Sequence, residues 1–209
     1  MIALDILLAD SRSLALPKNL AATLSASSQA RLTHISTDLR RRQFLLGRWL
    51  MAQAAERTLA NIEEGSDYPI FTGEPERHAS ISHSGPYIAV IVSQGMRCGL
   101  DIEYPIRQRN WLSLAERAFS ASETAWINNA GAELQTERFH RIWTLREAAF
   151  KAGLLDSVVG KESVFDPVQE RHIDNWHWRY LQHAGIHISV VGKQAFEASV
   201  QEIRTMALL

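Results

Sequence analysis

The chain has 209 residues, of which 46% are hydrophobic and 22% are charged, and its formal net charge is −1. These values are typical of a globular protein and argue against a broad basic surface for nucleic acid. The single cysteine, Cys98, excludes an intramolecular disulfide and fits a reducing cytoplasm. No apolar run approaches the roughly 20 residues of a membrane helix, so we expect no membrane partner.

The first part of the chain predicts a strand, a long helix and three more strands. An apolar run at 1–8 forms the first strand, and a polar connection follows through about residue 30. Apolar residues at helical spacing predict a helix over 37–60, with a start dense in arginine. After a loop containing several Gly and Pro residues, turn residues separate three short predicted strands: 79–84, 87–93 and 97–103.

The second part predicts helices followed by strands. A helix around Trp111 precedes one that opens with the capping-box pattern at 120–123. A third helix covers 134–152, and Gly153 is its expected C-terminal stop. The remaining predicted strands are 162–165, 176–182 and 185–191.

A helix followed by hairpin strands thus occurs twice. This order makes 87–93 and 186–192 candidate equivalent strands at the centres of two halves. Pro105 lies in the connection between them, so we predict an N-terminal half at 1–104 and a C-terminal half at 105–209.

The helix around Trp143 carries charges where a plain amphipathic helix would not. Arg146 projects near the middle of its apolar arc, and Glu147 and Lys151 line one edge, one turn apart. An exposed Glu147–Lys151 pair would account for those two residues, stabilising the helix by roughly 0.2–0.5 kcal/mol. It leaves Arg146 unexplained, because a buried cation needs an anion. We therefore expect this face to meet a polar site.

A strand at 99–103 places two carboxylates on one face. Asp101 and Glu103 alternate with Leu100 and Ile102, which we expect to face a core. Two neighbouring carboxylates repel each other unless a cation or protons intervene. Mg²⁺ is bound by such groups, although the same pattern also occurs on solvated strands.

Ser82-His83-Ser84 precedes a Gly-Pro turn and is the third signal. Its hydroxyls and imidazole suit phosphate oxygens, whereas the alternative is a turn capped by serine hydroxyls. Ser82 and His83 point to opposite faces of a strand, which disfavours a nucleophile–base pair.

Taken in order, these motifs resemble those of the 4′-phosphopantetheinyl transferases of the surfactin-synthetase-activating type. The similarity covers roughly residues 80–152 and looks closest to the short bacterial holo-[acyl-carrier-protein] synthases, which also have Asn-Trp soon after the Asp-x-Glu strand, as Asn110-Trp111 here. The resemblance implies an α+β fold of two similar halves, related by a pseudo-two-fold in one monomer. It also implies that coenzyme A binds in the cleft between the halves.

The resemblance assigns roles to particular residues. Lys151 would stabilise the charge that develops on the pyrophosphate, and Glu147 or a metal-bound water would take the proton of the acceptor serine. His83, with Ser82 nearby, would contact the nucleotide phosphates. The residues implied for Mg²⁺ are Asp101, Glu103 and Glu147.

The sequence also departs from the family pattern. Gln43 stands where relatives often have a coenzyme-contacting arginine, so Arg42 or Arg48 is the expected substitute. Glu74 stands where a basic residue is common, and Arg77, close by, is a further predicted contact for the coenzyme.

The implied reaction is transfer of 4′-phosphopantetheine from coenzyme A to a serine of an apo acyl- or peptidyl-carrier protein, releasing 3′,5′-ADP in the cytoplasm. The alternatives are a non-catalytic relative that binds coenzyme A or a carrier, and a metal-dependent phosphodiesterase. We expect Arg146, where lysine is usual, to hold a carboxylate such as Asp101 or Glu103, with a phosphate of coenzyme A as the alternative. We expect Glu123 to close a capping box and the carrier to dock near an apolar patch at 119–130.

Overall fold

The structure is a computed structural model that describes residues 2–66, 68–105, 110–163, 165–166, 171–172 and 176–204. The chain divides into two compact units, and each is described by itself. The α2 unit comprises Ala3–Arg97 and Ala198–Leu209, and the α5 unit comprises Met1–Ile2 and Cys98–Glu197. The division at Arg97 lies a few residues before the predicted boundary at residue 104, so the Asp-x-Glu strand belongs to the α5 unit.

The α2 unit is built on a four-stranded sheet with the order β11-β1-β5-β4. β1 and β5 are antiparallel, with Leu7 opposite Val90, and β5 is also antiparallel to β4. Gly85 begins the two-residue turn between β4 and β5 with φ +56°, a conformation that favours glycine. The strands are β1 (Ile2–Asp10), β4 (Arg77–Ser84), β5 (Tyr87–Gln94) and β11 (Phe196–Glu202).

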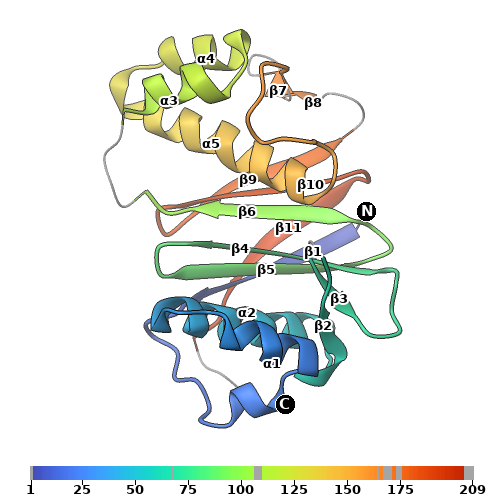
Figure 1. Cartoon of the computed structure of the whole chain (residues 1–209). Helices are drawn as coiled ribbons and strands as arrows, with labels where there is room; N and C mark the ends of the chain where they lie inside the picture. Colours follow the sequence, from blue (N-terminus) through green and yellow to red (C-terminus); the bar gives the residue numbers. More distant parts are fainter. Residues whose placement is uncertain are drawn as a thin grey trace. The chain divides into compact units, whose positions relative to one another are not determined.

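Helix α2 (Asp38–Ala55) packs against β5 and β4 (Figure 1). Thr37 caps its first turn by accepting a hydrogen bond from the Arg40 amide. The helix ends earlier than predicted because Glu56 adopts the left-handed conformation, with φ 53°. Leu46, Leu50 and Met51 of α2 are fully buried and form the core with apolar residues of the sheet.

Short elements that the sequence analysis missed complete the α2 unit. Their patterns span too few residues to show a period, and the short strands depend on pairing with partners distant in the chain. In addition, β11 pairs with β1 from the far end of the sequence. The missed elements are η1 (Leu20–Thr23), α1 (Ala26–Thr33), η2 (Leu59–Asn61), β2 (Ile62–Glu64), β3 (Pro69–Phe71) and β11.

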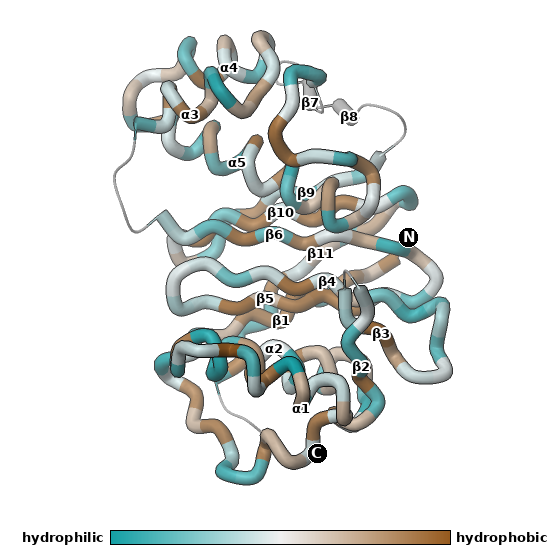
Figure 2. Tube along the Cα trace, in the orientation of Figure 1, coloured by the Kyte–Doolittle hydropathy of each residue, from teal (hydrophilic) through white to brown (hydrophobic). Residues whose placement is uncertain are grey.

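The α5 unit is built on an antiparallel sheet with the order β6-β10-β9. Every residue of β10 is buried, as expected for the middle strand beneath a helix layer. Figure 2 shows that hydrophobic residues dominate β10 and, in the α2 unit, β5. The strands are β6 (Cys98–Glu103), β9 (His177–His183) and β10 (Ile186–Gly192), with the two-stranded ribbon β7 (Phe165–Asp166) and β8 (Arg171–His172).

Three helices cover this sheet. α5 (Ala132–Lys151) packs on all three strands, and α3 (Trp111–Ala118) and α4 (Ala121–Asn128) pack on α5 (Figure 1). Asn110 caps α3, and the predicted capping box of Ser120 and Glu123 opens α4. The predicted order is therefore confirmed for the three helices and for β9 and β10, whereas β7 begins only at the end of the predicted strand 162–165 and β8 was not predicted.

Both units join helices to sheets in which most neighbouring strands are antiparallel, so the predicted α+β fold class is confirmed. β5 and β10, the two strands singled out as equivalent, are each the strand between two neighbours, and each is packed by the long helix of its unit. In the part of the chain that the structure describes, no helix has the length and hydropathy needed to cross a membrane.

Candidate active site

Gly99 determines how closely α5 approaches β6 in the α5 unit. A Cβ atom at Gly99 would overlap the carbonyl oxygen of Ala148 and lie 2.7 Å from the amide nitrogen of Ala152. The backbones of strand and helix are therefore in contact at this point. Since alternate residues of a strand share a face, Asp101 also faces α5. The glycine thus brings the Asp-x-Glu motif to the charged end of the helix.

A buried hydrogen bond also holds α5 against the middle strand, β10. The hydroxyls of Thr144 and Ser189 lie 2.7 Å apart, and both side chains are fully buried. Ser189 is directly opposite Asp101 in the register of β10 and β6. The pair could not be predicted from the sequence, because nothing local links the two residues.

Asp101 and Lys151 form an ion pair across this contact. The ammonium of Lys151 donates to Asp101 Oδ1 at 2.7 Å and to the carbonyl of Leu100 at 3.2 Å. The Asp101 side chain is 7% exposed and that of Lys151 is 28% exposed. Two residues predicted to act together from separate motifs are thus in direct contact.

Glu147 lies near the same group of charges. Burial raises its pKa, the negative charges of Asp101 and Glu103 raise it further, and the charge of Lys151 lowers it. Glu147 is therefore close enough to Asp101 and Glu103 for both to repel it, as the resemblance implies for a shared site.

The donor types fit a divalent cation, because carboxylate oxygens are the ligands that Mg²⁺ prefers. The repulsion that raises the pKa of Glu147 is also what a bound cation would relieve. Their present spacing is different: over the described ranges, no three or more His, Cys, Asp or Glu side chains are grouped so that they could hold a metal ion. In this arrangement Lys151 is the cation against Asp101.

Arg146 points away from these acids. Its guanidinium bonds to Glu123 Oε2 at 2.6 Å and to the carbonyls of Val158, Gly160 and Glu162. The prediction that Arg146 meets an anion is confirmed, whereas the expected partner, Asp101 or Glu103, is wrong. Helix periodicity located the buried charge, but the packing of α4 on α5 decides which acid reaches it.

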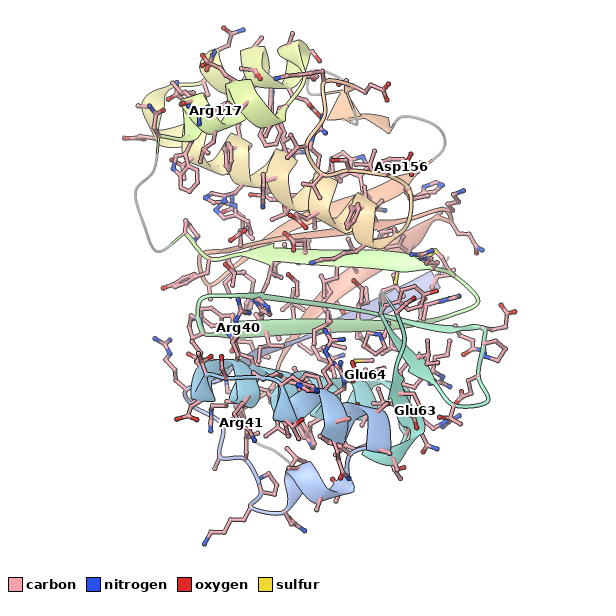
Figure 3. The ribbon with its side chains drawn as sticks, viewed as in Figure 1. Arg40, Arg41, Glu63, Glu64, Arg117 and Asp156 are labelled. Atoms are coloured by element: carbon pink, nitrogen blue, oxygen red, sulfur yellow. The ribbon has the colours of Figure 1, made fainter. Side chains whose placement is uncertain are left out.

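Ser82 and His83 lie on β4 in the α2 unit. Ser82 is buried and His83 is exposed, as expected for neighbours on a strand. One guanidinium nitrogen of Arg40, on the first turn of α2, is 3.1 Å from His83 Nδ1. Figure 3 labels Arg40 at this end of the helix. Arg40 belongs to the arginine-rich start of this helix, but it was not among the residues predicted for the site.

The three arginines predicted for coenzyme binding bond to acceptors within the α2 unit. Arg42 donates to the carbonyls of Ser11 and Leu14. Arg48 is buried and forms two hydrogen bonds of 2.7 Å with Glu64, which is labelled in Figure 3. Arg77 bonds to Glu74 at 2.7 Å and to a backbone carbonyl. A phosphate would have to share or replace these acceptors.

The two unusual residues noted in this unit also have structural contacts. Gln43 is buried and donates to the carbonyl of Gly85 at 3.0 Å, so it ties α2 to the turn that follows His83. Glu74 pairs with both Arg57 and Arg77. In the α5 unit, Phe119 and Ile127 are buried in the core, so neither contributes to the apolar docking patch expected at 119–130.

Comparison with known proteins places these residues in a family. A sequence profile of the 4′-phosphopantetheinyl transferase superfamily matches residues 97–196, which contain Asp101, Glu103, Glu147 and Lys151. The match begins one residue before β6 and covers almost the whole α5 unit.

Individual relatives extend the similarity. The 4′-phosphopantetheinyl transferase AcpT of Salmonella typhi is 34% identical over 131 residues, which are 62% of this chain and 68% of that protein. AcpT of Escherichia coli strain K12 is 35% identical over 112 residues, 54% of this chain and 57% of the relative. The 4′-phosphopantetheinyl transferase psf-1 of Bacillus pumilus is 36% identical over 90 residues, 42% of this chain and 36% of the relative.

Proposed function

Because the chain belongs to the 4′-phosphopantetheinyl transferase superfamily, we propose that it transfers 4′-phosphopantetheine from coenzyme A to a serine of an apo acyl- or peptidyl-carrier protein. The observation that carries the proposal is the contact of Asp101 with Lys151 beside Glu147, all within the matched segment. These groups suit attack of an alcohol on a pyrophosphate.

In the proposed reaction, the serine oxygen forms a bond to the pantetheine-bearing phosphorus, and the bond from that phosphorus to the bridging oxygen breaks. The leaving group is 3′,5′-ADP. Charge grows on the bridging oxygen, and Lys151 is the residue we assign to stabilise it, as a mobile point charge suited to phosphate. Asp101 holds the Lys151 ammonium near the site before the donor binds.

Glu147 is the proposed acceptor of the serine proton. Burial and the neighbouring carboxylates raise its pKa in the metal-free protein, whereas a divalent cation bound to the same carboxylate would lower it again. General base catalysis of this kind is worth about 10²–10⁴ in rate.

For the metal we propose Asp101, Glu103 and Glu147 as ligands and Mg²⁺ as the ion. The ion would neutralise charge on the pyrophosphate oxygens. Three neighbouring carboxylates on β6 and α5 support this assignment.

For coenzyme A we propose that His83, Ser82 and the adjacent Arg40 contact its phosphates. The exposed imidazole of His83 and the guanidinium of Arg40 support this, because together they attract an anion. The coenzyme contacts of Arg42, Arg48 and Arg77 stay predictions. Each guanidinium would have to leave its present hydrogen-bond acceptor in order to bind a phosphate.

We further propose a cytoplasmic monomer of the surfactin-synthetase-activating type that acts on a carrier protein and on neither nucleic acid nor membranes. The single buried Cys98 and the near-zero net charge support this setting.

Incubation with coenzyme A, Mg²⁺ and an apo carrier protein tests the proposal by intact mass. We expect the carrier to gain one phosphopantetheine and 3′,5′-ADP to appear in equal amount. An unchanged mixture would indicate a non-catalytic binding protein instead. Cleavage of coenzyme A without labelling of the carrier would indicate a phosphodiesterase.

A further inference from the structure

The ammonium of Lys151 already lies against a proposed metal ligand. It bonds to Asp101 Oδ1 and, on the same strand, to the carbonyl of Leu100. Both acceptors belong to β6, so the lysine is held at the strand rather than directed into solvent. A divalent cation bound through the same carboxylate oxygen would compete directly with this ammonium.

The balance of charge favours such a competition. When ionised, Asp101, Glu103 and Glu147 carry three negative charges, and the lysine beside them carries one positive charge. An ammonium relieves this repulsion less than a divalent ion, because it brings a single charge. The strand–helix contact at Gly99 limits how far the acids can separate.

The position of Lys151 allows it to move. It is the last residue of α5, its side chain is 28% exposed, and it has a flexible four-carbon stem. Gly153 follows with φ +71°, so the chain turns away directly after the helix. The ammonium can therefore leave Asp101 without any change in the packing of the helix.

We propose that Lys151 is an internal counter-ion that exchanges Asp101 for the donor's pyrophosphate when a divalent cation binds. This inference rests on the proposed function for the identity of the donor. In the metal-free protein the lysine offsets part of the repulsion among the acids. In the metal-bound protein the same lysine becomes available to the anion on which the reaction occurs, so the binding of metal prepares the binding of coenzyme A.

The affinity for Mg²⁺ alone, measured by calorimetry without coenzyme or carrier, provides the first test. Lys151→Met should bind Mg²⁺ at least tenfold more tightly than the parent, because the competing ammonium is gone. Lys161→Met is the matched control: the Lys161 ammonium bonds to the carbonyls of Glu116 and Phe119, so its loss should leave the affinity unchanged. An affinity of Lys151→Met equal to or weaker than that of the parent would overturn the proposal.

A second measurement uses the parent protein and does not depend on how stable the variant is. The rate at which acetic anhydride modifies Lys151, followed by peptide mass spectrometry, should rise severalfold when Mg²⁺ is added, while that of Lys161 should not change. An unchanged rate at a saturating Mg²⁺ concentration would mean that Lys151 remains on Asp101, and the proposal would be wrong. Absence of Mg²⁺ binding would also overturn it, whereas the mass assay of the carrier judges the proposed function separately.

Discussion

Arg146 and Glu123 form an ion pair with 2.6 Å between Nη2 and Oε2, and their side chains are 1% and 0% exposed. The pair joins three segments. Arg146 lies on α5, Glu123 opens α4, and the same guanidinium holds three carbonyls of the segment 158–162. Glu123 also accepts from the amide and hydroxyl of Ser120. The helix that carries Glu147 and Lys151 is thus fixed on its opposite side by a buried charge.

Replacing Arg146 by methionine should destabilise the protein by about 3–5 kcal/mol, because it leaves the Glu123 carboxylate buried without its cation. Arg146→Lys should retain part of this stability, since one ammonium cannot reproduce the planar fork that reaches Glu123 and the carbonyls together. Urea unfolding of the three proteins gives the ranking. A methionine variant within 1 kcal/mol of the parent would contradict the importance of the pair.

Glu123→Gln should lower stability while leaving turnover per folded molecule close to that of the parent. Glutamine can still accept from Ser120, so the capping box persists, but it removes the charge that Arg146 requires. We would measure kcat below the unfolding temperature together with the melting temperature. Loss of kcat at unchanged stability would assign Glu123 a catalytic role instead.

Gly99→Ala should both destabilise the protein and reduce activity. Its methyl group would overlap the backbone of α5, and a backbone cannot move aside as a flexible side chain can. Overpacking of this kind costs about 1–3 kcal/mol. Gly131→Ala is the control, because a Cβ at Gly131 meets nothing within 4 Å. Equal stability and kcat for the two variants would refute the role of the close approach.

Among the acids, Asp101→Ala and Glu147→Ala should each lower kcat/KM more than tenfold, and Glu103→Ala should have a smaller effect. Asp101 is buried against Lys151 and Glu147 is also the proposed base, whereas Glu103 is partly exposed at the end of β6. Transfer to an apo carrier at ordinary Mg²⁺ concentrations gives the order. Activity of either of the first two variants within tenfold of the parent would exclude the assigned site.

Glu64 should make the protein sensitive to acid. Burial raises the pKa of this carboxyl, but hydrogen bonds from Arg48 and Ser28 and the charges of Arg48 and Arg31 outweigh it, so the pKa is lowered from 4.5. A lowered native pKa means that the unfolded chain binds the proton first. The stabilisation is therefore complete above about pH 4.5 and is lost as the pH falls through the lower native value.

Urea unfolding between pH 6 and pH 3 checks this dependence, with Arg48→Met as the comparison. The variant should be less stable at pH 6, and its stability should fall less steeply in acid. The same variant also tests the prediction that Arg48 binds coenzyme A. If Arg48→Met is fully folded but binds coenzyme A much more weakly than the parent, Arg48 contacts the coenzyme despite its ion pair with Glu64.

Local chemistry explains what could be predicted from the sequence. The capping box at Ser120, the turn at Gly85 and the periodicity of α5 involve residues within a few positions of one another. The family motifs then indicated which acids belong together. The partner of Arg146 and the acceptors of Arg48 were beyond prediction, because they depend on which elements pack side by side and not on spacing along the chain.

The pairing of β11 with β1 determines the order in which the chain can fold. Ser199 bonds to Asp5 at 2.7 Å and the amide of Ile203 bonds to the carbonyl of Leu8 at 2.8 Å, so the two strands run in the same direction. All residues of the α5 unit from Cys98 onward are translated before this strand leaves the ribosome. During synthesis, the edge of β1 that pairs with β11 therefore has no partner strand. A nascent chain arrested before Phe196 exposes this edge as a template for aggregation.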